Sequence, residues 1–344
     1  IFLKGASGRE PLFFCPFGTV FLSALDCMAK IVYNRQVNAG NGQRRGAHMS
    51  NKRFHGVMPA LYTPITDENE LKVDETRALL EKELAAGVHG FYLCGATGEG
   101  PLLPEKTRMR MAEVAKEQVG GRTALIDHVG ACDVKSAIRL ARHAEEVGMD
   151  AISSVPPTFF VNYDEDAVFR YYKQLSESCN LPLLVYANAM FRQGDIVKFI
   201  DRVMRLPTVI GLKFTRYNYY EMRRIVELNG GDINVINGPD EMLICGLTMG
   251  ADGGIGSTYN MMGPAFVKLY NAFTEGRFED ARQLQFRINR CIEIMLRHDG
   301  CMKQVLSEGG IDVGRPAFPG RVYTRGEMRG IMDELNRVGY QELT

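Results

Sequence analysis

Residues 123–154 read TALIDHVGACDVKSAIRLARHAEEVGMDAISS, and this stretch contains the unit that predicts the fold. Two short apolar runs, 123–128 and 151–154, flank a longer segment, 133–147, in which apolar residues recur at helical spacing. The predicted inward face of this helix consists of Ala137, Leu140, Ala141 and Ala144, and its solvent face carries Arg139, Arg142 and His143. A strand, a helix and a second strand in this order predict two parallel strands.

The same alternation runs in both directions from this unit and occurs eight times in all. The predicted strands are 57–63, 90–93, 123–128, 151–154, 183–186, 209–214, 234–237 and 253–256. The predicted helices are 73–87, 104–119, 133–147, 164–178, 194–205, 218–229, 241–249 and 260–275. A doubly wound open sheet is the competing architecture, but eight units with short connections favour a (β/α)8 TIM barrel, an α/β fold.

Two parts of the chain lie outside the repeat. Helical patterns over 278–298 and 326–339, joined by a Gly/Pro-rich segment over 309–320, predict a C-terminal helical extension over 276–344 beside a barrel over 55–275. Residues 1–54 do not continue the pattern, so we expect an N-terminal extension that is disordered or not native. Its apolar stretch resembles a signal peptide, but no A-x-A-like cleavage site follows it.

The composition narrows the function. The 344 residues include 41 basic and 41 acidic side chains, a balance that argues against nucleic acid or an anionic membrane as the main partner. Hydrophobic residues make up 45% and charged residues 24%, as in ordinary globular proteins. The eight cysteines form no CxxC pair, so we expect a reduced, cytoplasmic protein.

In a TIM barrel the chemistry lies just after the strands, and the second strand is followed by GATGEG, residues 95–100. The glycine spacing does not match a dinucleotide fingerprint, and the chain contains no GxxxxGK phosphate loop. Glycines allow backbone N–H groups to converge on an anion, and Thr97 adds a hydroxyl donor. The motif therefore indicates either a carboxylate-binding turn or a plain Gly-rich turn.

The sixth strand places a single lysine, Lys213, in an apolar run. Burial disfavours the charged form of an amine and makes it a nucleophile that can form a Schiff base, although a lone strand lysine can also extend to solvent. Tyr186 ends the neighbouring fifth strand, and adjacent strands lie about 4.8 Å apart. The phenol can therefore approach the amine as a proton donor, or it can serve as a structural tyrosine.

The last two strands are followed by GPDE, residues 238–241, and by the run 253–260. The paired carboxylates Asp240 and Glu241 can accept hydrogen bonds from a polyhydroxy ligand or cap the next helix. The six histidines are scattered and no HExxH motif occurs, so we expect no metal site.

Together, GATGE, the Tyr186 strand, GLKFT around Lys213, GPDE and GADGGIGSTYN (residues 250–260) resemble the N-acetylneuraminate lyase and dihydrodipicolinate synthase superfamily. The similarity covers about 56–300 and is greatest to the N-acetylneuraminate lyase branch. The resemblance implies a Schiff-base (class I) aldolase that acts on pyruvate and a sugar or aldehyde, without an external cofactor, and that assembles as a homotetramer.

The resemblance also implies roles for individual residues. Lys213 would form the imine with pyruvate and Tyr186 would transfer the proton. The substrate-binding residues would be Gly95, Ala96, Thr97, Gly98, Thr215, Gly238, Asp240, Glu241, Gly256, Ser257 and Arg192. Thr97 and the Gly95–Gly98 backbone would hold the carboxylate, and Asp240, Glu241 and Ser257 would contact the sugar's hydroxyl tail.

Several positions depart from the family's pattern. Ala96 and Phe160 stand where a hydroxyl residue and a tyrosine are usual, and Ala187-Asn188-Ala189 replaces Asn-x-Pro. Arg192 is similar to a dihydrodipicolinate synthase arginine that grips a second carboxylate. Three functions therefore stay open: cleavage of N-acetylneuraminate or a related sugar acid, condensation of pyruvate with aspartate semialdehyde, and keto-acid binding without turnover.

Overall fold

The computed structural model describes residues 50–157, 163–188, 194–317 and 320–344, and residues Ser50–Thr344 form one compact unit. Eight parallel strands form its centre: β1 Gly56–Pro59, β2 Gly90–Leu93, β3 Ala124–His128, β4 Ala151–Ser154, β5 Leu183–Ala187, β6 Val209–Phe214, β7 Asn234–Asn237 and β8 Gly253–Gly256. Their order is β1-β8-β7-β6-β5-β4-β3-β2, and a parallel bridge between Ala60 and Tyr92 joins the two ends. The predicted TIM barrel is confirmed.

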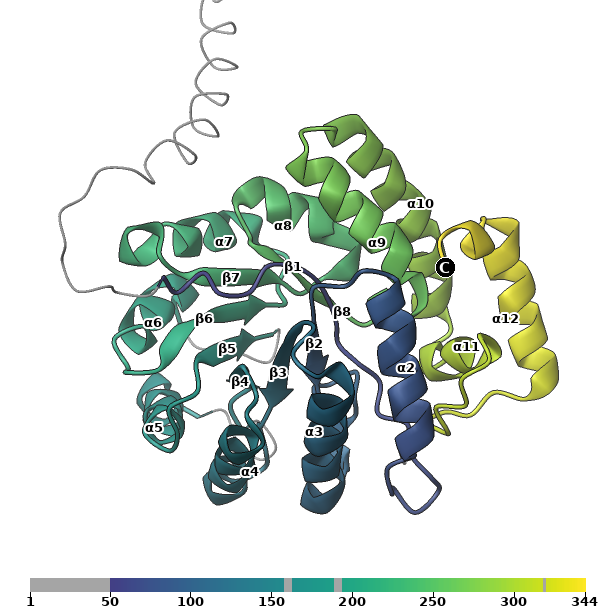
Figure 1. The fold of residues 1–344 in the computed structure, drawn as a ribbon. Coiled ribbons are helices and arrows are strands. Elements are labelled where there is room, and N and C mark those ends of the chain that lie inside the picture. The colour runs from purple at the N-terminus through teal and green to yellow at the C-terminus, as the bar shows by residue number, and fades with distance from the viewer. Residues whose placement is uncertain (1–49, 158–162, 189–193, 318–319) are drawn as a thin grey trace, which may run out of the picture. The chain divides into compact units, whose positions relative to one another are not determined.

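The helices surround the strands (Figure 1). Those of the repeat are α2 Val73–Ala85, α3 Glu105–Val119, α4 Val134–Val147, α5 Glu165–Ser176, α6 Ile196–Val203, α7 Tyr219–Val226, α8 Leu243–Met249 and α9 Tyr259–Thr274. The 3-10 turns are η1 Gly100–Leu102, η2 Leu228–Gly231, η3 Asp240–Met242 and η4 Tyr340–Glu342. Within the described residues, no helix combines the length and the apolar character that crossing a membrane would need.

The unit from β3 to β4 shows how the sequence sets these elements. The Asp133 carboxylate accepts a hydrogen bond from the Ser136 N–H at 3.0 Å, a cap that typically stabilises a helix by about 1 kcal/mol. Gly148, at φ 83°, ends α4 in the left-handed conformation that glycine tolerates. The four residues predicted to face inward are buried: Ala137, Leu140, Ala141 and Ala144.

The first strand is shorter than predicted. β1 ends at Pro59 rather than at residue 63. Beyond it Ala60 makes only an isolated bridge to Tyr92, and the Tyr62 N–H already donates to the Asn260 side chain at 3.3 Å. At its other end, residues before β1 already contact the barrel. Lys52 pairs with Asp252 at 2.8 Å, and the Phe54 N–H donates to the Asn234 side chain at 2.9 Å, so ordered contacts begin before residue 55.

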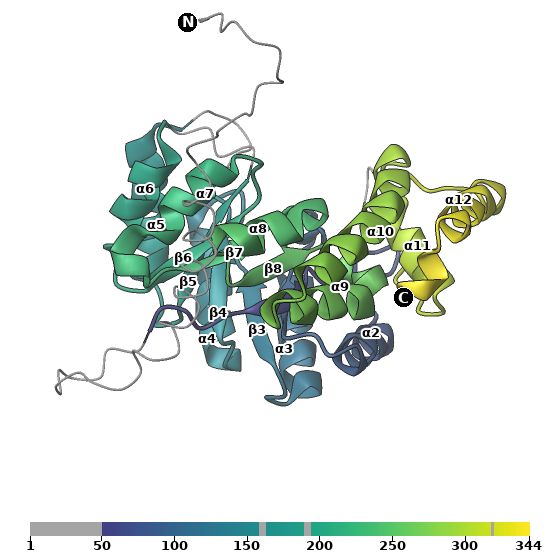
Figure 2. The ribbon, with the colours of Figure 1, turned by 90° about the horizontal axis from the view of Figure 1, so that it is seen from above.

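Three C-terminal helices lie outside the ring (Figures 1 and 2): α10 Phe278–Arg297, α11 Met302–Glu308 and α12 Arg325–Arg337. α10 packs on α9, and α11 contacts both α9 and α12. The two long helices were predicted. α11 was not, because seven residues are too few to display a helical period.

The apolar side chains form two layers. One fills the space between the strands and the helices. The other fills the barrel interior and consists of Phe54, Met58, Ala60, Tyr92, Ile126, Ala151, Leu184, Tyr186, Ile210, Ile236 and Ile255. The interior is therefore a packed core, and in a barrel of this kind functional groups lie toward the carboxyl ends of the strands.

Candidate active site

Lys213 and Tyr186 face each other inside the barrel, because the parallel register of β5 and β6 pairs them directly. The Lys213 Nζ lies 4.4 Å from the centre of the Tyr186 ring and 4.6 Å from that of Tyr92. Lys213 is only 5% exposed. The amine therefore contacts two aromatic faces inside the barrel and does not extend to bulk water.

An irregularity in β6 sets this direction. The pairing of β5 with β6 runs from Leu183–Val209 to Leu184–Gly211, so Ile210 is an extra residue on β6. Side chains alternate along a regular strand, and residues three apart face opposite ways. The bulge lets both Ile210 and Lys213 face the barrel interior.

The GATGEG turn follows β2 and is tightly constrained. Cys94 and Glu99, at φ 53° and 56°, adopt the left-handed conformation at either end of it. A Cβ on Gly95 would lie 2.5 Å from the Tyr92 ring, and one on Gly98 would lie 2.8 Å from the Leu61 carbonyl oxygen. These two glycines are therefore required by close packing, and Gly95 stands over the ring that contacts the Lys213 amine.

The turn meets the loop after β8. The Thr97 hydroxyl lies 2.6 Å from the Ser257 hydroxyl, so the two share a hydrogen bond. Ala96, between the glycine and Thr97, is exposed and brings no polar group. Two hydroxyls that are 160 residues apart in the sequence thus converge next to the glycine backbone. Hydroxyl and backbone N–H groups placed together in this way can donate hydrogen bonds to an anion such as a carboxylate.

Thr215, just after β6, offers a further hydroxyl. Its N–H donates to the Ala187 carbonyl at 2.7 Å, whereas its buried Oγ1 has no hydrogen-bond partner within the described part of the chain. A Cβ on Gly238 would lie 1.9 Å from this oxygen, so only glycine fits there. A substrate can supply the missing partner.

The Asp240 carboxylate is buried and already accepts hydrogen bonds from within the protein. Its Oδ2 accepts hydrogen bonds from the Thr258 N–H at 2.7 Å and the Thr258 hydroxyl at 2.6 Å. Burial raises the pKa of Asp240 to about 6, although the Thr258 hydrogen bonds and the Lys213 ammonium act to lower it. A Cβ on Gly256 would lie 2.2 Å from Oδ1, so the carboxylate packs against that glycine. Asp240 therefore joins the loops after β7 and β8.

Glu241 is half-exposed and turns toward the rim. Its Oε1 accepts a hydrogen bond from the Tyr217 hydroxyl at 2.5 Å, and this bond is the main reason that the pKa of Tyr217 rises to about 12. Tyr217 is 69% exposed. The Glu241 carbonyl accepts from the Asn289 amide of α10 at 3.0 Å. Glu241 is thus the carboxylate of the pair that solvent and ligand can reach.

Two residues next to the amine were not singled out from the sequence. Tyr92 lies within β2, and its hydroxyl donates to Ser153 at 3.0 Å. His128, at the end of β3, has its ring centre 6.0 Å from that of Tyr186. Its position at a strand end was a usable signal. Arg192 and Phe160 fall outside the described residues. Among the residues that are described, no group of three His, Cys, Asp or Glu side chains could hold a metal ion.

His128 ties three strand ends together. Its Nδ1 lies 3.2 Å from the Cys94 carbonyl, and its Nε2 accepts from the Val155 N–H at 3.2 Å. Burial, with contributions from Arg108 and Lys213, lowers the pKa of His128 to about 3. The imidazole is therefore neutral, donating through Nδ1 and accepting through Nε2.

Comparison with known proteins agrees with this geometry. Residues 53–320 match the sequence profile described as the Dihydrodipicolinate synthetase family. An N-acetylneuraminate lyase of Rhizobium meliloti is 34% identical over 269 residues, which cover 78% of this chain and 89% of that protein. An N-acetylneuraminate lyase of Citrobacter koseri is 34% identical over 247 residues, which cover 72% of this chain and 83% of that protein. The solved N-acetylneuraminate lyase of Proteus mirabilis superimposes with a TM-score of 0.79 at 27% identity, covering 83% of this chain and 99% of that one.

Proposed function

The chain belongs to the dihydrodipicolinate synthetase family and is a pyruvate-dependent class I aldolase, a carbon–carbon lyase without an external cofactor, and on this premise we propose that it cleaves N-acetylneuraminate or a closely related sugar acid through Lys213. The observation that carries the proposal is the Lys213 amine, buried against the Tyr186 ring 4.4 Å away. The relatives named N-acetylneuraminate lyase support the choice of substrate.

The mechanism starts with imine formation. The Lys213 amine, in its uncharged form, attacks the keto carbon of the substrate, and the Tyr186 hydroxyl donates a proton to the departing hydroxide. Water leaves, and a protonated imine and a Tyr186 phenolate remain. This cation withdraws electrons, so the bond between the third and fourth substrate carbons can break without forming a bare carbanion. The bonding pair moves into an enamine.

Proton transfer completes the reaction. The Tyr186 phenolate accepts the proton of the fourth-carbon hydroxyl as the bond breaks, which releases an aldehyde sugar. Tyr186 then returns this proton to the third carbon of the enamine. Water hydrolyses the resulting imine to free pyruvate and the lysine amine, and Tyr186 regains its hydroxyl proton. The same steps in reverse order carry out aldol addition.

Substrate binding divides between the two sides of the amine. We assign the carboxylate to the Thr97 hydroxyl and the adjacent Gly95–Gly98 backbone, with Ser257 as the hydroxyl partner of Thr97. Glu241 is assigned to the hydroxyl tail. Asp240 acts by holding this rim together, because its Oδ2 is already occupied by Thr258.

The assembly and the compartment are part of the proposal. We assign a homotetramer, as the family resemblance implies, and a cytoplasmic location. The cysteines that the structure describes, Cys94, Cys132, Cys179, Cys245, Cys291 and Cys301, are free thiols, which supports a reducing compartment. Light scattering of the purified protein tests the tetramer.

The substrate proposal is tested with purified protein and a panel of aldols. We expect release of pyruvate from N-acetylneuraminate, and reduction with borohydride in the presence of pyruvate should leave a pyruvyl adduct on Lys213. Pyruvate adduct without turnover of N-acetylneuraminate would retain the chemistry and reject this substrate. Consumption of pyruvate with aspartate semialdehyde would instead identify the condensation reaction.

A further inference from the structure

Lys303, on α11, is far from the barrel strands in sequence but is buried against the site. It is only 2% exposed, and its Nζ lies 2.8 Å from Glu99 Oε2 and 2.8 Å from the Arg315 carbonyl oxygen. Burial lowers the pKa of Lys303, whereas the Glu99 carboxylate raises it. An ammonium buried to this degree depends on its partners, so the link to Glu99 is specific.

Glu99 is the last residue of the turn before η1, and the C-terminal segment holds both of its oxygens. Oε1 accepts a hydrogen bond from the Ala317 N–H at 3.0 Å, opposite the Lys303 contact on Oε2. Glu99 adopts φ 56°, a conformation that non-glycine residues rarely populate. A residue keeps such a conformation only when its surroundings fix it. Here the Glu99 N–H donates to the Ala96 carbonyl within the turn at 3.0 Å, and residues from 303–317 hold the Glu99 side chain.

Glu99 is two positions after Thr97, whose hydroxyl the proposed function assigns to the substrate carboxylate. Thr97 shares its hydrogen bond with Ser257, and the Gly98 carbonyl accepts from the Thr63 hydroxyl at 2.7 Å. If Glu99 relaxed, the peptide units at Thr97 and Gly98 would turn with it. The direction of the turn's backbone N–H groups, which the proposed function assigns to the substrate carboxylate, would therefore depend on Glu99.

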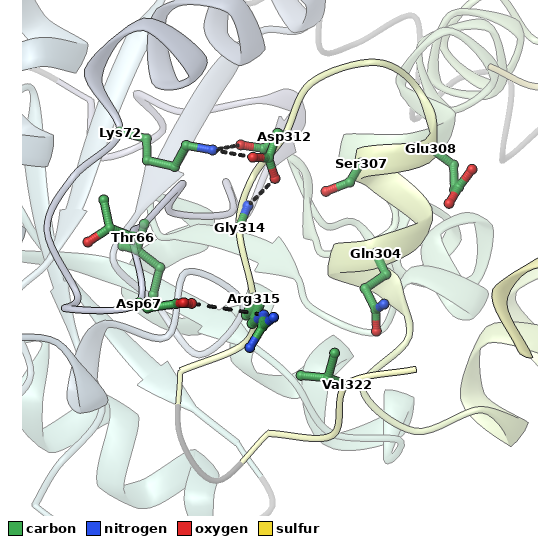
Figure 3. A pocket seen from close by; sticks show the side chains of 11 residues that line it. Thr66, Asp67, Lys72, Gln304, Ser307, Glu308, Asp312, Gly314, Arg315 and Val322 are labelled. Atoms are coloured by element: carbon green, nitrogen blue, oxygen red, sulfur yellow. Dashed lines mark hydrogen bonds and ion pairs between the residues drawn. The ribbon is translucent and has the colours of Figure 1, made fainter. Parts of the chain in front are cut away.

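The outer face of the same C-terminal segment is held differently (Figure 3). It borders an open cleft of about 500 Å³ lined by Ile65, Thr66, Asp67, Lys72, Gln304, Ser307, Glu308, Asp312, Gly314, Arg315 and Val322. Across this cleft Lys72 pairs with Asp312 at 2.5 Å, and the Asp312 side chain is 75% exposed. The Lys303–Glu99 pair is the more deeply buried of the two, with side chains 2% and 16% exposed, so we expect its loss to cost the segment more.

We propose that Lys303 is a positioning residue for the keto-acid carboxylate: by holding Glu99, it fixes the backbone on both sides of Gly98 in the conformation that binds pyruvate. The inference rests on the proposed function, since it assigns the turn to that carboxylate. It makes the C-terminal extension part of the substrate-binding apparatus, although no residue of α11 is assigned to contact the ligand.

The test compares Lys303→Met with Lys72→Met in the full-length protein. Both replace an ion-paired lysine that holds the same segment by an uncharged chain of similar length, but only Lys303 contacts Glu99. The pyruvate concentration that gives half-maximal borohydride trapping should rise about tenfold in Lys303→Met and stay within about twofold of wild type in Lys72→Met. The trapping rate at saturating pyruvate should change by less than about threefold, because Lys213 and Tyr186 are untouched.

Glu99→Gln provides a second route, because it removes the charge while its amide oxygen can still accept from Ala317. Glu99→Gln should also raise the pyruvate concentration that gives half-maximal trapping. If Lys303→Met does not fold, the result for Glu99→Gln tests the inference instead. Folded variants that trap pyruvate at wild-type concentrations, with only a lower thermal midpoint, would overturn the inference and leave the proposed function intact. Failure of the wild-type protein to trap pyruvate would overturn both.

Discussion

The turn after β2 and the loop after β7 both serve the same amine, but they are supported in different ways. The turn over 94–100 combines two left-handed residues with a buried ion pair between Glu99 and Lys303. The Asp240–Glu241 loop has neither and is held by neutral amides of α10: Gln285 donates to the Asp240 carbonyl at 3.2 Å and Asn289 to that of Glu241 at 3.0 Å. The difference suggests that the carboxylate end of the substrate needs a rigid receptor and that the tail end tolerates adjustment.

The largest effect is expected at the amine between the two regions. Lys213→Met removes the nucleophile and keeps an apolar chain, so turnover should fall by at least about 10⁴-fold and mass spectrometry should find no pyruvyl adduct after borohydride treatment. The fold should survive, because methionine keeps an apolar chain in the space beside the Tyr186 and Tyr92 rings. Lys198→Met, at an exposed position, is the control and should trap normally. An adduct on the Lys213→Met protein would move the nucleophile to another residue.

Acid should weaken the support of the first region through His128. Its pKa is about 3 in the folded protein and near 6.5 when unfolded, so stability present above pH 6.5 is lost as the pH falls toward 3. Between pH 7 and 4.5 this loss is roughly 2–3 kcal/mol. His128→Gln does not titrate there, and urea unfolding should show a correspondingly smaller loss than in wild type. Equal losses in the two proteins would contradict the assignment of this titration to His128.

The second region should respond separately from the first. Gln285, 2% exposed, also accepts from the Ile244 N–H of α8 at 3.1 Å, so Gln285→Met removes one contact of the Asp240–Glu241 loop and one of the adjoining helix without altering the turn after β2. We expect KM for N-acetylneuraminate to rise about tenfold while the half-maximal pyruvate concentration in trapping stays within about twofold. A parallel rise in both constants would show that the two regions are not independent.

The smallest effect is expected at Tyr217, whose hydroxyl orients Glu241 from an exposed position. Tyr217→Phe removes one hydrogen bond that water can replace, so KM for the sugar acid should rise by about two- to threefold. Tyr220→Phe is the matched control, because Tyr220 is 73% exposed and contacts Arg224. If steady-state kinetics show the same KM for these two variants, Tyr217 does not orient Glu241 for substrate binding.

The sequence predicted the barrel because each strand–helix unit carries its own pattern, and position at a strand end drew attention to Lys213, Tyr186 and Thr97. It did not predict the Glu99–Lys303 pair, since the residues are separated by most of the barrel and nothing in a local pattern joins them. It also did not predict that Asp240 is committed to Thr258, because GPDE presents two equivalent carboxylates until the loop after β8 is in place. Tyr92 was missed because a tyrosine inside an apolar strand is also a normal core residue.

The extra residue in β6 shows how the length of this strand can change. Ile210 and Lys213, three residues apart, both point inward because the strand carries one residue more than its neighbour. A deletion of Gly211 would remove the bulge and leave Ile210 and Lys213 two residues apart, so a regular strand would still point both side chains inward. The strand can therefore gain or lose one residue at this point without turning the lysine away from the barrel interior.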